Sequence, residues 1–231
     1  MRWAAVIVAA GHGKRFGGPK QFLELEGLPI VGWSIRTFAA MPEIAQLVVA
    51  TEPEFIAPMV ELCARLAPRH AALVVRGGAT RQQSVYQGLR AVSSECEAAL
   101  VHDGARPLVQ AENVRVAMAE VRGGRAALLA MPVVDTIKAV DSSLRVTTTL
   151  DREFLWAAQT PQLATIADLR AAHECARRDG VDATDDAALL ERAGIEVVVV
   201  PSTSENFKIT HPADVARAAA LLRHPRRAKD A

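Results

Sequence analysis

The sequence predicts an α/β fold in which a mostly parallel β-sheet is the middle of three layers, with helices on both faces. Apolar runs rich in valine, alanine and leucine alternate along the chain with stretches that have the period of a helix. These runs lack polar alternation, as expected for strands buried on both faces of a parallel sheet. Half of the 231 residues are hydrophobic, which is enough for one sizeable core.

The elements follow one another in strand–helix order. Predicted strands cover 4–10, 46–51, 72–78, 98–103, 125–133 and 195–200. Predicted helices lie near 31–40, within 54–67, within 80–92, and near 111–121, 165–178 and 184–193. A last helix is expected from about Pro212, because proline suits a first helical turn and Asp214 would lie near the positive helix end. This order is typical of a Rossmann-like sheet.

The alternation stops between about 138 and 163. The segment "KAVDSSLRVTTTLDREFLWAAQTPQ" has a threonine triplet, alternating polarity and turn residues, but no helical period. We therefore expect a β-arm or hairpin that projects from the sheet. We find no repeat and no linker, so residues 1–231 are predicted to form one domain with this arm.

Composition argues against several classes of partner. The net charge of +1 gives no general attraction to nucleic acid or to a membrane surface. No apolar run approaches the roughly 20 residues of a membrane span, and the first run leads directly into a glycine loop rather than a cleavage site. The three cysteines are scattered without metal-binding spacing, which predicts reduced thiols in a cytoplasmic protein.

The loop "AAGHGKRFGGPKQF" (9–22) follows the first strand and combines glycines with Lys14, Arg15 and Lys20. Exposed backbone amides after a strand are the general phosphate cradle of α/β folds, and three cations suit a triphosphate. The alternative is a surface loop with solvated side chains. The loop lacks the GK[ST] of a P-loop, and Phe16 occupies the third glycine position of a dinucleotide fingerprint.

The motif "LVHDGARP" (100–107) places Asp103 directly after an apolar strand, at the same sheet edge as the glycine loop. A carboxylate there can hold Mg²⁺ against phosphate oxygens, because Mg²⁺ commonly uses only one or two carboxylates. Arg106 is expected to pair with Asp103 rather than to contact substrate. His102 points to the opposite face of the strand and is expected to pack or to support, rather than to bind a ligand.

The motif "SENFKIT" (204–210) follows the last strand and offers Glu205 as a further carboxylate and Lys208 as a further cation. The competing interpretation is an ordinary surface turn. Nothing in this motif alone decides between the two.

Taken together, these motifs resemble the 2-C-methyl-D-erythritol 4-phosphate cytidylyltransferase family. The resemblance extends over nearly the whole chain and includes "GGATRQQSVYQGL", "PVVDTIK", "TLDREFLWAAQTPQ", "ATDDAALLERAG" and "ENFKITHPAD". It implies transfer of a cytidylyl group from CTP to methylerythritol 4-phosphate with release of pyrophosphate, in the non-mevalonate route to isoprenoids. It also implies Mg²⁺ and a homodimer in which the arm reaches the neighbouring active site.

The resemblance also implies roles for individual residues. Arg15 and Lys20 would hold the triphosphate and, with Lys208, act in catalysis, and Asp103 would hold the metal. The nucleotide would be bound by Ala9, Ala10, Gly11, Gly13, Lys20, Gly78, Ser84 and Asp103. The methylerythritol phosphate would be bound by Thr136, Arg152, Glu205 and Lys208.

Two positions depart from the family pattern, since Glu205 and Ala79 stand where the family commonly has aspartate.

Three other functions compete with the implied one. A ribitol-phosphate cytidylyltransferase would share the loop and the reaction type. A non-catalytic nucleotide-binding subunit would have less need of Lys20, Asp103 and Lys208, and a dinucleotide-dependent oxidoreductase is disfavoured by the glycine spacing.

Overall fold

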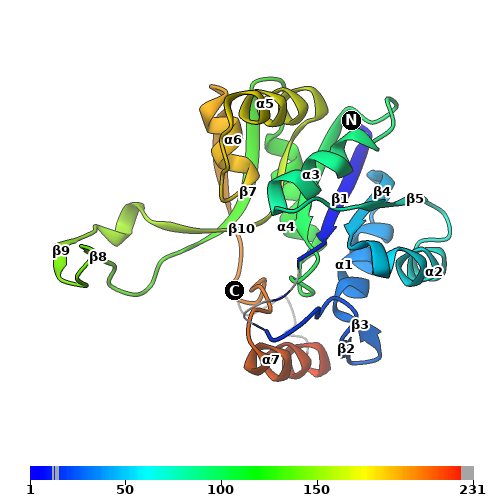
Figure 1. Cartoon of the computed structure of the whole chain (residues 1–231), viewed down its shortest axis with the longest axis horizontal. Coiled ribbons are helices and arrows are strands. Elements are labelled where there is room, and N and C mark those ends of the chain that lie inside the picture. Colours follow the sequence, from blue (N-terminus) through cyan, green and yellow to red (C-terminus); the bar gives the residue numbers. More distant parts are fainter. Residues whose placement is uncertain (12, 14–15, 225–231) are drawn as a thin grey trace.

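The computed structural model of the chain describes residues 1–11, 13 and 16–224. Its centre is a seven-stranded sheet in the order β11-β7-β10-β6-β1-β4-β5 (Figure 1). The strands are β1 (Trp3–Ala9), β4 (Ile44–Thr51), β5 (Ala71–Arg76), β6 (Ala98–Asp103), β7 (Arg125–Pro132), β10 (Trp156–Thr165) and β11 (Glu196–Pro201). All neighbouring pairs are parallel except those of β10, which runs antiparallel to both β6 and β7.

Helices cover both faces of this sheet, which confirms the predicted three layers. On one face lie α1 (Ile30–Ala39), α2 (Ile56–Leu66) and α4 (Ala111–Glu120), whose apolar side chains pack with Ala5 and Ile7 of β1. On the other lie α3 (Arg81–Arg90), α5 (Ile166–Asp179) and α6 (Asp186–Arg192), packed with Ala4 and Val6. Alternate residues of one strand thus serve two hydrophobic layers, because side chains alternate across a strand.

A smaller unit lies below the sheet in Figure 1. The helix α7 (Pro212–Arg223) packs with the short hairpin of β2 (Glu24–Leu25) and β3 (Leu28–Pro29) through a separate apolar cluster that includes Leu25 and Ala218. The sequence pattern predicted α7 but not this two-stranded hairpin. Two short 3₁₀ turns, η1 (Pro53–Phe55) and η2 (Arg152–Phe154), complete the elements.

The predicted arm is shorter than the pattern indicated. The hairpin of β8 (Lys138–Val140) and β9 (Val146–Thr149) projects from the body of the protein (Figure 1). The segment 156–163, predicted as part of the arm, instead belongs to β10 in the central sheet. Its polar residues Gln159, Thr160 and Gln162 are buried and hydrogen-bonded inside the protein, so the strand carries no apolar run for sequence reasoning to find.

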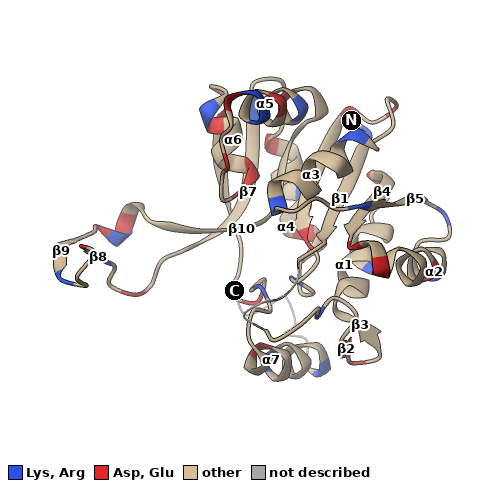
Figure 2. Cartoon of the chain, viewed as in Figure 1, with Lys and Arg blue, Asp and Glu red and all other residues tan. Residues whose placement is uncertain are grey.

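Basic and acidic residues are interspersed along the chain rather than gathered by sign in one part of it (Figure 2). Among the residues that the structure describes, no helix is long and apolar enough to cross a membrane. The described cysteines Cys63, Cys96 and Cys175 form no disulfide, in agreement with the predicted free thiols.

Candidate active site

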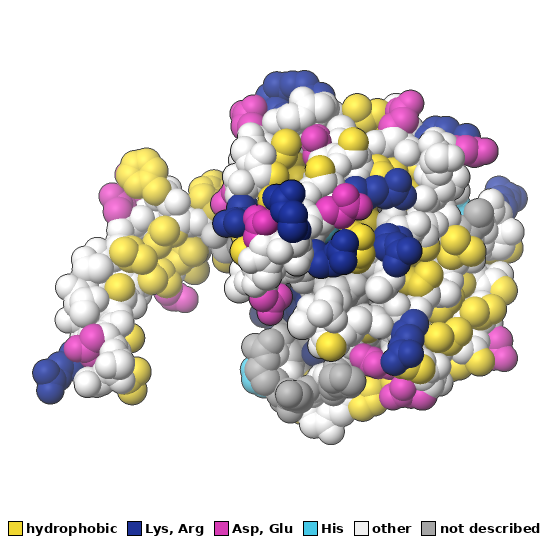
Figure 3. Space-filling view, turned by 45° about the horizontal axis from the view of Figure 1, so that its top comes forward, with side chains coloured by type: hydrophobic (Ala, Val, Ile, Leu, Met, Phe, Trp, Pro, Cys, Tyr) yellow, Lys and Arg dark blue, Asp and Glu magenta, His cyan; other side chains and the backbone are white. Residues whose placement is uncertain are grey.

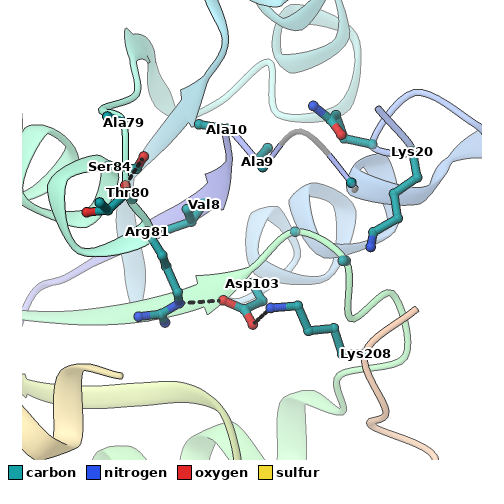
Figure 4. Close-up of a pocket in the computed structure, with 15 residues that line it drawn as sticks. Val8, Ala9, Ala10, Lys20, Ala79, Thr80, Arg81, Ser84, Asp103 and Lys208 are labelled. Atoms are coloured by element: carbon teal, nitrogen blue, oxygen red, sulfur yellow. Dashed lines mark hydrogen bonds and ion pairs between the residues drawn. The ribbon is translucent and has the colours of Figure 1, made fainter. Parts of the chain in front are cut away.

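A pocket of about 360 Å³ opens where β1 and β6 end, beside the first turn of α3 (Figure 4). The two strands are parallel neighbours, and Val8 pairs with Asp103, so the loop after β1 and the carboxylate after β6 meet at one edge of the sheet. Eight of the residues predicted from the sequence line this pocket: Ala9, Ala10, Gly11, Gly13, Lys20, Ser84, Asp103 and Lys208.

The loop after β1 forms one wall of the pocket. Gly13 has a φ of +61°, and a Cβ at this position would collide with the carbonyl oxygen of Gly18. The amides of Phe16 and Gly17 donate to the Gly13 carbonyl oxygen at 2.8 and 3.0 Å. These amides therefore close a turn, although the sequence predicted that loop amides would face a polyanion. Arg15 lies outside the described residues.

The start of α3 forms the opposite wall. Thr80 caps the helix by accepting from the Gln83 amide at 3.1 Å. The Ser84 hydroxyl donates to the Thr80 carbonyl oxygen at 2.9 Å and accepts from the Gly78 amide at 3.0 Å. Gly78 does not line the pocket itself but an adjoining open groove, and a Cβ there would collide with the Gln83 side chain.

Asp103 is the anionic centre of the pocket. Its carboxylate accepts from Arg81 Nε at 3.0 Å and from Lys208 Nζ at 2.8 Å (Figure 4). Arg106 Nε lies 4.0 Å from the same carboxylate, as the predicted Asp103–Arg106 pairing requires. Burial by itself would raise the pKa of Asp103, but the charges of Arg81 and Lys208 outweigh it and hold that pKa well below its usual range. The carboxylate is therefore ionised at neutral pH.

Arg81 is the functional candidate that sequence reasoning missed. It is the first residue of α3, where a cation opposes the helix dipole. A cation at the first position of a helix is unfavourable unless an anionic group lies nearby. The presence of an arginine at this position is therefore the sequence signal that could have identified Arg81. The guanidinium contacts Asp103 in the pocket and, through the nitrogen Nη1, Asp186 at 2.9 Å behind it.

Lys20 lies on the opposite side of the pocket from Arg81 (Figure 4). Its Nζ is 5.6 Å from the centre of the Phe16 ring, a favourable cation–π distance. Lys20 and Lys208 thus approach the same space from two loops that are remote in sequence.

The loop that carries Lys208 is hydrogen-bonded to the turn that follows β6. Arg106 Nη1 donates to the Asn206 carbonyl oxygen at 2.7 Å, and the Ile209 amide donates to the Ala105 carbonyl oxygen at 2.8 Å. Glu205 lies in this loop, with its amide donating to Thr203 Oγ1, but does not line the pocket.

His102 is fully buried against the edge of Phe38 and hydrogen-bonds the Arg106 carbonyl oxygen through Nε2 at 3.1 Å. Burial lowers the pKa of His102 to about 4, so the ring is neutral at pH 7. The prediction of a packing and supporting histidine is confirmed.

Thr136 and Arg152 do not reach the pocket of their own chain. Both are exposed on the segment that forms the arm, and Arg152 Nη1 donates to the Val134 carbonyl oxygen at 2.6 Å. The structure therefore separates these two predicted acceptor-binding residues from the eight that it brings together.

Among the described residues that line the pocket, Asp103 is the one carboxylate that could hold a metal ion. Within the described part of the chain, no three His, Cys, Asp or Glu residues are grouped as a metal site. A single ionised carboxylate at the pocket suits Mg²⁺, which keeps several waters and takes phosphate oxygens of a substrate as its other ligands.

Comparisons with known proteins agree with this geometry. Residues 3–224 match the family model described as 2-C-methyl-D-erythritol 4-phosphate cytidylyltransferase. Proteins with that name from Acidobacterium capsulatum and Desulforamulus reducens are 40% and 42% identical to the chain. The alignments cover 96% and 95% of this chain, and 98% and 95% of the relatives.

Solved structures give the same result. The crystal structure of 4-diphosphocytidyl-2C-methyl-D-erythritol synthase from Anaerococcus prevotii superposes with a TM-score of 0.86 at 26% identity, covering 96% of each chain. The 2-C-methyl-D-erythritol 4-phosphate cytidylyltransferase of Thermus thermophilus has a TM-score of 0.78 at 38% identity, covering 96% of this chain and 100% of its own.

Proposed function

Because the chain belongs to the 2-C-methyl-D-erythritol 4-phosphate cytidylyltransferase family, we propose that the pocket at the ends of β1 and β6 is where it carries out the family's reaction. The chain is a nucleotidyltransferase that joins CTP and 2-C-methyl-D-erythritol 4-phosphate to give 4-diphosphocytidyl-2-C-methyl-D-erythritol and pyrophosphate, a step of non-mevalonate isoprenoid biosynthesis. The observation that carries the proposal is the convergence of Lys20, Asp103 and Lys208 on one pocket.

The chemistry needs no nucleophilic side chain. A phosphate oxygen of the acceptor attacks the α-phosphorus of CTP, the bond from that phosphorus to the bridging oxygen breaks, and pyrophosphate leaves with the bonding electron pair. The protein has to bring two polyanions together and stabilise the charge that develops on the α-phosphate.

Lys20 and Arg15 would hold the triphosphate and the developing charge. In the structure Lys20 reaches the pocket from the glycine loop, opposite Asp103. Lys208 would hold the acceptor phosphate, since its side chain is 37% exposed and can turn toward a ligand. Glu205 stays a candidate for the acceptor's hydroxyl groups.

The cytidine would lie between the two walls of the pocket. Ala9, Ala10 and Gly11 form the first wall, and Ser84 with the loop at Gly78 forms the second. Ala79 has no polar side chain to read a base, so recognition at this position would be through the backbone.

Asp103 would hold Mg²⁺, which when bound would neutralise phosphate charge. The ionised state of Asp103 supports this role, and its two oxygens have lone pairs beyond those used by Arg81 and Lys208. Arg81 would keep the carboxylate oriented toward the pocket.

The arm would complete the site in a homodimer. An apolar surface is exposed on it (Figure 3), including Val140, Leu144, Val146, Leu150 and Phe154. Exposed apolar patches of this kind mark interaction sites. A second copy that covers this surface would bring Thr136 and Arg152 to the acceptor of the neighbouring subunit.

The cytoplasmic location expected from the sequence stays a prediction.

Pyrophosphate release from CTP and Mg²⁺ tests the proposal, with 2-C-methyl-D-erythritol 4-phosphate and ribitol 5-phosphate as parallel acceptors. We expect release with the first acceptor. Release with ribitol 5-phosphate alone would keep the mechanism but change the acceptor, and binding of CTP without release from either would contradict an enzymatic role.

A further inference from the structure

A chain of alternating charges runs from the pocket into the protein. Lys208 Nζ contacts Asp103 at 2.8 Å, Asp103 accepts from Arg81 Nε at 3.0 Å, and the Nη1 of Arg81 lies 2.9 Å from Asp186 Oδ2. The first three residues line the pocket, whereas Asp186 does not. The network therefore connects the pocket to a carboxylate behind it, at the start of α6.

Asp186 is fixed from several sides. Its side chain is 1% exposed, and its Oδ1 lies 3.0 Å from Nε2 of the equally buried His173. Its backbone amide donates to Gln162 Oε1 at 2.8 Å, which ties the start of α6 to the buried strand β10. A carboxylate held in this way is a rigid anchor for the guanidinium that it contacts.

The two cations on Asp103 differ in how easily each could leave. Arg81 bridges two carboxylates with little exposure to water, so its departure would take the guanidinium from the buried Asp186 and one of the cations from Asp103. Lys208 is paired with Asp103, is 37% exposed, and would leave behind a carboxylate that still has Arg81 and Arg106 beside it. Arginine also suits the bridging position, because its planar fork can bind two acceptors at once.

We propose that Arg81 is a positioning residue, anchored by Asp186, that keeps Asp103 in place while Lys208 moves from Asp103 to the phosphate of the acceptor. This inference rests on the proposed function, because it assigns a departure to Lys208 that only a phosphate ligand would cause. It also gives a role to Arg81 of "GGATRQQSVYQGL" and to Asp186 of "ATDDAALLERAG", the second of which is a segment that the proposed chemistry leaves unused.

The test compares Asp186→Asn with Asp185→Asn. Asp185 is the adjacent carboxylate at the same helix start, where it accepts from the Ala188 amide and from Gln162 Nε2. The same substitution there also acts at the start of α6 but leaves the Arg81 contact in place. Pyrophosphate release is measured at saturating CTP and 2-C-methyl-D-erythritol 4-phosphate, CTP affinity by calorimetry without acceptor, and folding by thermal unfolding.

We expect Asp186→Asn to lower kcat by about 10-fold or more, because displacing a catalytic group by about 1 Å can cost up to about 10²-fold. Its CTP affinity should stay close to that of the wild type, since the Asp186 side chain contacts Arg81 and His173 and does not line the pocket. Asp185→Asn should keep the wild-type kcat. Arg81→Gln should lower kcat as well, and the double variant with Asp186→Asn should lose no more than Arg81→Gln alone.

A folded Asp186→Asn variant with the kcat of Asp185→Asn would overturn the inference, as would losses that multiply in the double variant. If Asp186→Asn does not fold, Arg81→Lys decides, because lysine keeps the charge but cannot bridge both carboxylates. Wild-type kcat in Arg81→Lys would overturn the inference. A wild-type enzyme that releases no pyrophosphate would instead defeat the proposed function.

Discussion

Replacing Asp103 with asparagine removes the negative charge around which the pocket is organised. Arg81 Nε and Lys208 Nζ lie 3.0 and 2.8 Å from this carboxylate, and Arg106 Nε lies 4.0 Å away. Removing one partner of a buried ion pair typically costs about 3–5 kcal/mol. The cost should be lower here, because Lys208 can turn into water, Arg81 keeps Asp186, and the new amide oxygen can still accept from Arg81.

We therefore expect Asp103→Asn to lower the free energy of unfolding by about 2 kcal/mol. For a chain of this length about 1 kcal/mol corresponds to roughly 2–4 °C, so the melting temperature should fall by about 4–8 °C. Pyrophosphate release should fall by about 10²-fold or more, as when a preorganised transition-state contact is removed. Calorimetric melting and a steady-state assay measure the two effects on the same sample.

Asp182→Asn is the matched control, because Asp182 is an exposed carboxylate and should change neither quantity. An unchanged or raised melting temperature in Asp103→Asn would contradict this expectation. It would mean that the cluster of cations around Asp103 does not depend on its charge for stability.

Three further predictions concern other parts of the site. Lys20→Ala should lower kcat by about 10² or more, and a loss confined to KM would make Lys20 a simple binder. Mixed dimers of Lys20→Ala and Arg152→Ala subunits should regain activity that neither variant has alone. One of the two sites then has both Lys20 of its own subunit and Arg152 from the arm of the other. If the arm acts within its own chain, the mixed dimers would regain no activity. Asp214→Ala should lower the free energy of unfolding by about 1 kcal/mol, because Asp214 accepts from the Thr210 and His211 amides just before α7. Burial raises the pKa of Asp214, but the hydrogen bonds from the His211 and Thr210 amides outweigh burial and leave the pKa below its usual value. The stabilisation is therefore present at pH 7 and is lost as the pH falls below about 3.9, which urea titrations at pH 7 and pH 3 measure.

The sequence pattern located most of the sheet because its parallel strands are apolar on both faces. Strand β6 matches the predicted 98–103 at both ends. The sequence pattern places part of β10 in the arm, because Gln159, Thr160 and Gln162 are buried polar residues whose partners come from segments distant in the sequence. A polar strand of this kind is recognisable only once those partners are known.

The parts of the site that depend on the order of the strands could be predicted from the sequence. Parallel neighbours end at the same edge of a sheet, so the glycine loop and Asp103 had to lie together. The pairing of Lys208 with Asp103 and the link from Arg81 to Asp186 join residues that are about 100 positions apart. No periodicity or spacing encodes such contacts, because they depend on how the loops pack.

A crystal structure of the protein with CTP bound tests the central claim most directly. We expect the triphosphate between Lys20 and Asp103, the base between Ala10 and Ser84, and Arg81 still in contact with Asp103 and Asp186. CTP bound in the adjoining groove beside Arg76 and Arg90, with this pocket left empty, would contradict it.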